Sequence, residues 1–235
     1  MRRVPGEGAR STVVTKQVAK QTVAGQTEAT STPERSKRRA HKFEVRREEL
    51  ADVALATLAE RGYAQTSLRD IAENSDFTHG VLHYYFHDKS ELITYCVRRY
   101  KQRCVMRYEG AVLPSATVED LRRTFADAMV STLIDDAHMQ RLWYDLRSQA
   151  MFERSLAADV AELDAGIGDL MLRIVTRYAA LSQRRLVVEP ELLYALLDGL
   201  FQHTLIRQLR GDEPAADLRR GLDFLLDTVT SPASG

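Results

Sequence analysis

The chain has 235 residues, of which 44% are hydrophobic and 28% are charged. This length allows one large domain or two small ones with a substantial core. No apolar run approaches the roughly 18 residues that a membrane-spanning helix needs, and the polar N-terminus has no apolar signal segment, so we expect no membrane partner and a cytoplasmic location.

The formal net charge is zero, but the charges are unevenly distributed. Residues 1–42 hold ten Lys or Arg and three Glu, a net charge of +7, which leaves −7 for the other residues. Residues 1–40 also lack aromatic side chains and a sustained apolar period, which predicts a disordered basic arm. The arm is either a solvated tail without a role or a source of extra phosphate contacts.

The remainder is predicted to be all-α. Leu50, Val53, Ala54 and Leu58 form the apolar stripe of a helix over residues 46–61, and Gly62 ends it. The other helices, two short and then six longer, are predicted at about 68–73, 78–84, 88–109, 118–135, 139–150, 154–181, 190–209 and 215–229. No strand is predicted, because no segment alternates between apolar and polar residues and is bounded by hairpin turns.

The two cysteines, Cys96 and Cys104, lie in one predicted helix. A spacing of eight residues separates them by about 12 Å at roughly 1.5 Å per residue, whereas a disulfide needs Cα atoms within about 7 Å. We expect packing thiols, and the alternative is a redox sensor that links two chains.

Residues 66–92 have the layout of a helix-turn-helix DNA-binding motif. Thr66 or Ser67 can cap the first short helix, residues 74–76 form a polar turn, and Thr78 can cap the second helix. The second helix of such a motif enters the major groove, where polar side chains distinguish base edges.

This stretch resembles the N-terminal domain of the tetracycline-repressor (TetR) family. The resemblance is carried by Gly62, Tyr63, Thr66, Ser67, Asp70, Ile71, Ala72, Thr78, Gly80, Leu82, Tyr85, Phe86, Lys89, Glu91 and Leu92. It implies a DNA-binding domain at residues 41–92. Phosphate contacts would come from Thr66 or Ser67, His83 and Lys89, and groove contacts from Thr78, His79, Gly80 and Tyr84.

Two positions depart from the family pattern. His83 stands where the family usually has Tyr, and Asp76 stands where it usually has a turn glycine. Histidine can still donate to a phosphate, and Asp tolerates a left-handed turn. His79, His83 and His87 could also suggest a metal site, but His87 falls beyond the short helix, so no metal is expected.

The resemblance further implies that residues 93–231 form a helical domain that dimerises and encloses a ligand pocket. The segments LWYDLRSQ and LLYALLDGL give it a weaker similarity to the choline-responsive BetI-type branch. Large and partly polar residues on inward helix faces are the candidate pocket lining: Met139, Trp143, Arg147, Phe152, Met171, Val175, Tyr178, Tyr194, Phe201 and His203. Ordinary core packing explains the same spacing. Arg147 is the exception, because an inward guanidinium requires an anionic partner from the protein or a ligand.

The last two helices are candidates for the dimer interface, because their leucines cover an arc too wide for one core-facing stripe. The expected interface residues are Leu193, Leu197, Leu200, Leu218, Leu222, Leu225 and Val229. A core within one chain is the alternative. Asp198 lies in this apolar segment, either as a hydrogen-bonded carboxylate or on an exposed edge.

These patterns predict a ligand-responsive, homodimeric transcription regulator without a cofactor. It would be a repressor that a small-molecule effector releases from a palindromic double-stranded DNA operator. The alternative is a small helical enzyme or ligand carrier. No catalytic triad, phosphate-binding glycine loop or diagnostic carboxylate pair supports an enzyme.

Overall fold

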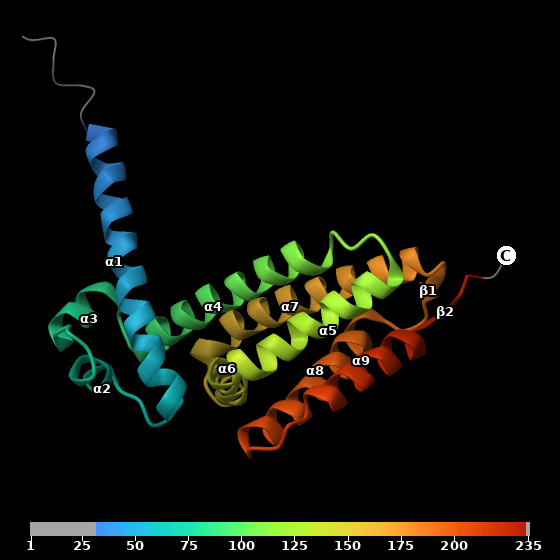
Figure 1. Cartoon of the computed structure of the whole chain (residues 1–235). Coiled ribbons are helices and arrows are strands. Elements are labelled where there is room, and N and C mark those ends of the chain that lie inside the picture. The colour runs from blue at the N-terminus through green and yellow to red at the C-terminus, as the bar shows by residue number, and fades with distance from the viewer. Residues whose placement is uncertain (1–31, 234–235) are drawn as a thin grey trace, which may run out of the picture. The chain divides into compact units, whose positions relative to one another are not determined.

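The computed structural model describes residues 32–233, which form helices, their connecting turns and one short β ribbon (Figure 1). The helices are α1 (Thr32–Arg61), α2 (Leu68–Glu73), α3 (His79–Tyr85), α4 (Lys89–Val112), α5 (Val118–Asp135), α6 (Ala137–Ala150), α7 (Arg154–Leu181), α8 (Pro190–Leu209) and α9 (Ala215–Thr228). The chain divides into two compact units at Lys42, and the packing described below is that of residues 43–233. None of the described helices is long and apolar enough to cross a membrane.

Helix α1 is longer than its apolar stripe predicts. It begins at Thr32, so the predicted disorder is wrong for residues 32–40. Residues 34–46 are rich in Arg, Lys and Glu, which favour a helix without needing an apolar face. Pro33 stands in the first turn, where its missing N–H leaves no hydrogen bond unmade. Residues 1–31, the rest of the predicted arm, lie outside the described residues.

A two-stranded antiparallel ribbon corrects the prediction that the chain has no strand. It pairs β1 (Arg184–Leu186) with β2 (Thr230–Pro232), in the register Arg185 to Ser231. Gln183 has a positive φ of 53° and turns the chain from α7 into β1. Strands of three residues are too short for a period-two pattern to be visible in the sequence.

Two apolar clusters form the interior of residues 43–233. One lies between the C-terminal part of α1, α2, α3, the start of α4, α6 and the start of α7, with Leu58, Phe86 and Trp143 buried in it. The other lies among the end of α4, α5, α7, α8 and α9, around Phe125 and Ile174. In Figure 1, α4, α5 and α7 run alongside one another. The predicted domain boundary at residues 92 and 93 falls inside α4, which contributes to both clusters.

Candidate functional site

The turn between α1 and α2 is built by hydrogen bonds close in sequence. Gly62 has a φ of +80°, as predicted for a helix-ending glycine. Ser67 is the N-cap of α2, since its Oγ accepts the Asp70 N–H at 3.2 Å and the Asp70 carboxylate accepts the Ser67 N–H at 2.8 Å. The hydrogen bond from the Ser67 hydroxyl lowers the pKa of Asp70.

Thr66 does not have the predicted exposed position. Its side chain is buried, and its hydroxyl donates to the Gly62 carbonyl at 2.8 Å. The adjacent hydroxyls could not be separated in the sequence, because either can cap a helix. Of the two, Ser67 is the exposed one.

Helix α3 presents its predicted DNA-reading residues to solvent. Thr78 caps the helix by accepting the Val81 N–H at 3.3 Å, and Leu82 holds the opposite face in the core. The predicted groove residues Thr78, His79, Gly80 and Tyr84 are all exposed, as is His83. Tyr84 is 71% exposed. The next two aromatic side chains pack inward, because Phe86 is fully buried and Tyr85 is half-buried.

An open groove next to α3 brings together Ser67, His83 and Lys89, which the sequence separates by up to 22 residues. Lys89 lies at the start of α4, where its Nζ donates to the Tyr63 carbonyl at 2.9 Å and lies 4.1 Å from the centre of the Tyr63 ring. An ammonium has three donors, so the hydrogen bond to Tyr63 leaves two for an anion. The groove is also lined by Thr66, His87 and the carboxylates of Asp70 and Asp88, so hydroxyl, imidazole and ammonium donors lie there together with two acidic side chains.

The two departures from the family pattern fit this surface without distortion. Asp76 is exposed in the turn, and within residues 32–233 Gln183 is the one non-glycine residue with a positive φ. The turn therefore does not need the left-handed conformation that the sequence comparison invoked. His79 and His83 stack edge to face at 4.4 Å, and no group of three metal-ligating side chains is found in the described part of the chain.

A second candidate site is a cavity of about 70 Å³ among α4, α5, α6, α7 and α8. Four predicted pocket residues line it: Trp143, Met171, Tyr194 and Phe201. Lys101, Cys104 and Tyr108 line it from α4, and Gln140 and Tyr144 line it from α6. None of these five was predicted to line the pocket, although Lys101, Cys104 and Tyr108 share a helix face at spacings of three and four.

The anionic partner that Arg147 requires is Asp198. The Arg147 guanidinium donates to the Asp198 carboxylate at 2.7 Å, and the Tyr144 hydroxyl donates to the other oxygen at 2.8 Å. Burial raises the pKa of Tyr144, and the nearby Asp198 charge adds to this, so Tyr144 remains a donor. Arg147 also lies 3.5 Å from a carboxylate oxygen of Asp164, which accepts the Tyr194 hydroxyl at 2.6 Å. Asp198 is thus the hydrogen-bonded carboxylate of the two alternatives.

The other pocket predictions fall elsewhere. Phe152 is 83% exposed just after α6, and His203 is exposed on the outer face of α8. Val175 is fully buried in the core, and Met139 packs against the cluster that contains α1. Helical spacing groups residues on one face but does not say whether that face meets a cavity, a solid core or solvent.

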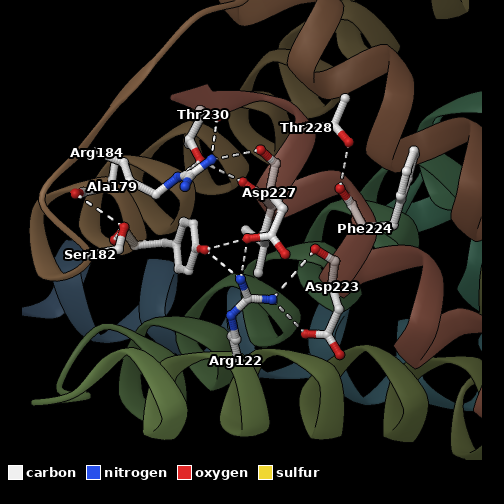
Figure 2. Close-up of polar contacts among 11 residues, drawn as sticks. Arg122, Ala179, Ser182, Arg184, Asp223, Phe224, Asp227, Thr228 and Thr230 are labelled. Atoms are coloured by element: carbon white, nitrogen blue, oxygen red, sulfur yellow. Dashed lines mark hydrogen bonds and ion pairs between the residues drawn. The ribbon is translucent and has the colours of Figure 1, made fainter. Parts of the chain in front are cut away.

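Tyr178 belongs to a polar network rather than to the cavity. Its hydroxyl accepts from Arg122 at 2.5 Å and donates to Asp227 at 3.0 Å. Figure 2 shows Arg122 reaching from α5 to Asp223 and Asp227 on α9, with Arg184 beside Thr230. This network ties α5, α7, α9 and the ribbon together, which is a structural role.

Most of the predicted dimer residues are in the chain's own core. Leu193, Leu197, Leu218, Leu222 and Val229 are each 2% exposed or less. Leu200 and Leu225 are partly buried. The Leu200 side chain packs closely on Gly221, since a Cβ added to this glycine would lie 2.8 Å from Leu200 Cδ1. The exposed apolar residues of α8 and α9 are their neighbours Leu192, Leu196, Ile206, Leu209 and Phe224.

Comparisons with known proteins agree with this arrangement. Residues 50–96 match the family model described as bacterial regulatory proteins, tetR family. The transcriptional regulator PksA of Bacillus subtilis is 22% identical over 174 residues, covering 71% of this chain and 82% of that protein. The regulator BetI of Burkholderia thailandensis is 29% identical over 119 residues, covering 48% of this chain and 58% of that protein.

Among solved structures, a transcriptional regulator from Saccharomonospora viridis in complex with choline has a TM-score of 0.67. It is 16% identical, and the match covers 80% of this chain and 99% of that one. This similarity concerns the fold.

Proposed function

We propose that this chain, which belongs to the tetR family of bacterial regulatory proteins, is a homodimeric transcriptional repressor that a small molecule releases from a palindromic operator. The observation that carries the proposal is the convergence of Ser67, His83 and Lys89 in one groove beside the exposed face of α3. Hydroxyl, imidazole and ammonium groups are phosphate donors, and the α3 side chains are of the kind that read base edges.

The geometry supports a division of labour within this surface. Ser67, His83 and Lys89 would fix the protein on the phosphate backbone, while Thr78, His79 and Tyr84 would reach into the major groove. A Cβ added to Gly80 would have Thr78 Oγ1 as its nearest neighbour, 4.0 Å away, so the surface at Gly80 is open. Without a side chain there, the helix backbone can approach the bases closely.

Mobility shifts with the DNA upstream of the protein's own gene test this surface. We expect His83→Ala and Lys89→Ala each to weaken DNA binding by about tenfold, because each removes one phosphate contact. Lys89→Ala should also reduce, by about one, the slope of the logarithm of the binding constant against the logarithm of the salt concentration. Arg185→Ala is the matched control, since it removes an exposed cation on β1, outside the DNA-binding domain.

The result can contradict the proposal in two ways. Equal affinity of both variants and the wild-type protein would show that the contact surface is wrong. Binding of the wild-type protein without any salt dependence would favour a ligand carrier or an enzyme over a DNA-binding regulator. Thermal melts of each variant exclude unfolding as the cause of lost binding.

The dimer is proposed to form through the outer face of α8 together with α9. Leu192, Leu196, Gly199, His203 and Ile206 follow one another at spacings of three or four on α8, and all are exposed. Phe224 on α9 is 67% exposed. Burial of such a stripe against a second copy would remove large apolar side chains from water and hold two α3 helices about one DNA turn apart.

Light scattering of full-length variants tests the interface. Leu196→Glu and Phe224→Glu each place a charge on this face, so we expect the dimer to dissociate at micromolar concentration. Phe152→Glu is the matched control, because Phe152 is even more exposed but lies outside α8 and α9. Dimers of unchanged stability in both interface variants would refute this placement.

Helix α6 supports a route from the cavity to the DNA reader. Trp143 and Tyr144 line the cavity. From the same helix, Arg141 donates to the Ala59 carbonyl at 2.5 Å, and the Asp145 carboxylate accepts the Tyr63 N–H at 2.6 Å. An effector that favours a different position of α6 would therefore change the support of the α1–α2 turn and shift the population away from the DNA-binding state.

A further inference from the structure

The cavity contains one cation that lacks an anionic partner. Lys101 is 7% exposed, and its Nζ donates to Gln140 Oε1 at 2.8 Å. Gln140 is a neutral acceptor, held in place because its amide nitrogen donates to the Tyr100 hydroxyl at 2.8 Å. Among residues 32–233, no carboxylate is paired with the Lys101 ammonium, which leaves donors of this buried group free to meet a ligand.

The carboxylate that lines the cavity is already neutralised. Asp198 receives hydrogen bonds from Arg147 and Tyr144, so it offers no open charge to a cationic ligand. The aromatic faces are also occupied by the chain's own cations. Lys101 Nζ lies 4.8 Å from the centre of the Trp143 ring, and the Arg147 guanidinium lies 5.4 Å from that of Tyr144.

The remaining lining is mostly apolar and leaves room for a small molecule. Val105, Leu170, Met171, Leu197 and Phe201 contribute side chains without charge. One water needs about 10 to 15 Å³ of such space, so a cavity of about 70 Å³ holds on the order of five non-hydrogen atoms before any side chain moves.

We propose that the cavity binds a small organic carboxylate, with the carboxylate on Lys101 and the apolar part against Leu170, Met171 and Phe201. The inference rests on the proposed function only in making this molecule the effector of the regulator. Burial lowers the pKa of Lys101 to about 8, and a bound anion would favour its charged form. A quaternary ammonium ligand such as choline, bound by the similar Saccharomonospora viridis protein, does not fit the charges of this cavity.

Thermal shift and calorimetry on the full-length protein test the proposal at pH 7 in a buffer without carboxylates. The probes are acetate, propionate and butyrate, their neutral amides acetamide, propionamide and butyramide, and choline. We expect at least one carboxylate to raise the melting temperature, with its amide binding at least about tenfold more weakly because the charge-assisted hydrogen bond is lost.

Two variants separate a specific site from a general charge effect. Lys101→Met keeps the length of the side chain and should abolish the carboxylate shift. Arg103→Met removes an exposed cation from the same helix and should leave the shift unchanged. Absence of any carboxylate shift in the folded protein, a larger effect of choline, or carboxylate binding that survives in Lys101→Met would overturn the proposal.

Mobility shifts with the same probes keep the two proposals distinguishable. Loss of DNA from the wild-type protein in carboxylate, but not from Lys101→Met, would support both. Carboxylate binding by a protein that never binds DNA would support this cavity assignment and sink the proposed function.

Discussion

Lys101→Met should stabilise the protein, and the size of the effect should depend on pH. The buried ammonium has one hydrogen bond and lies over the Trp143 ring but has no carboxylate partner, so folding removes it from water with incomplete compensation. Its pKa is lowered from 10.5 to about 8, first because of burial. This lowering of the pKa means that folding disfavours the charged form of Lys101 by about 3 kcal/mol, since one pKa unit is about 1.4 kcal/mol.

The sign follows from which state holds the proton. Below pH 8 the folded and unfolded chains both hold it, and the free energy of unfolding carries the full cost of the buried charge. Between pH 8 and 10.5 the unfolded chain still holds the proton and the folded chain has lost it, so the wild-type protein gains stability as pH rises. Lys101→Met lacks this gain, because methionine does not titrate.

Urea unfolding of both proteins at pH 7, 8, 9 and 10 measures this dependence of the free energy of unfolding on pH. The protomer concentration is kept fixed, because the stability of a dimer depends on it. The advantage of Lys101→Met over the wild-type protein should be largest at pH 7 and should shrink by about 2 to 3 kcal/mol by pH 10. Comparing the two proteins cancels the titration of the tyrosines and of the other lysines. A difference that stays constant from pH 7 to 10 would refute the reasoning, because the buried amine would then titrate as it does in the unfolded chain.

Two further predictions concern the contacts around the sites. Gly62→Ala should lower the free energy of unfolding by more than about 1 kcal/mol, because its φ is +80° and the new Cβ would lie 2.9 Å from the Asp145 carboxylate, whereas Gly166→Ala in α7 should raise it by up to about 1 kcal/mol. Denaturant unfolding of both decides the point, and equal effects would contradict it. Asp198→Asn should cost about 1 to 3 kcal/mol by removing the charge that Arg147 pairs with, and combining it with Arg147→Met should cost less than the two changes summed. Additive losses would mean that the pair contributes nothing.

The DNA-binding motif was predictable because its signals are local. Hydroxyl N-caps, a helix-ending glycine and short apolar faces act within a few residues, and Gly62 and Thr78 have their expected roles. The choice between Thr66 and Ser67 was not predictable, because it depends on which hydroxyl is turned toward the Gly62 carbonyl.

The larger helical domain was less predictable because helix faces have to be assigned to partners. The leucines of α8 cover both an inner and an outer face, as their spacing indicates, but that spacing does not say which face meets the core. Leu193 and Leu197, which were expected at the dimer interface, are buried in the core of the chain, while Leu192 and Leu196 are exposed. The signal that could have helped is Asp198, since a carboxylate one residue after Leu197 marks the side of α8 on which Arg147 lies.

Lys101 shows a different limit. A lysine in an amphipathic helix is ordinarily solvent-exposed, so composition and spacing give no reason to place it inside. It is buried by side chains of α6, because Trp143 lies over its ammonium and Gln140 accepts its hydrogen bond. Both partners are about 40 residues away in the sequence, with nothing local to indicate the contact.

Helix α6 connects the two sites because its faces carry different chemistry. One face of α6 contacts the charged groups around the cavity through Gln140, Trp143 and Arg147, which are spaced three and four residues apart. Each residue turns the helix by about 100°, so Arg141 and Asp145, one or two residues away from these, lie on another face and bind the end of α1. The second set binds backbone groups, the carbonyls of residues 59 and 60 and the N–H of residue 63. These backbone contacts hold the α1–α2 turn without involving the side chains that we propose to contact DNA. Under the proposed function, an effector that displaces α6 at the cavity would also displace the α1–α2 turn, because a helix moves largely as a unit.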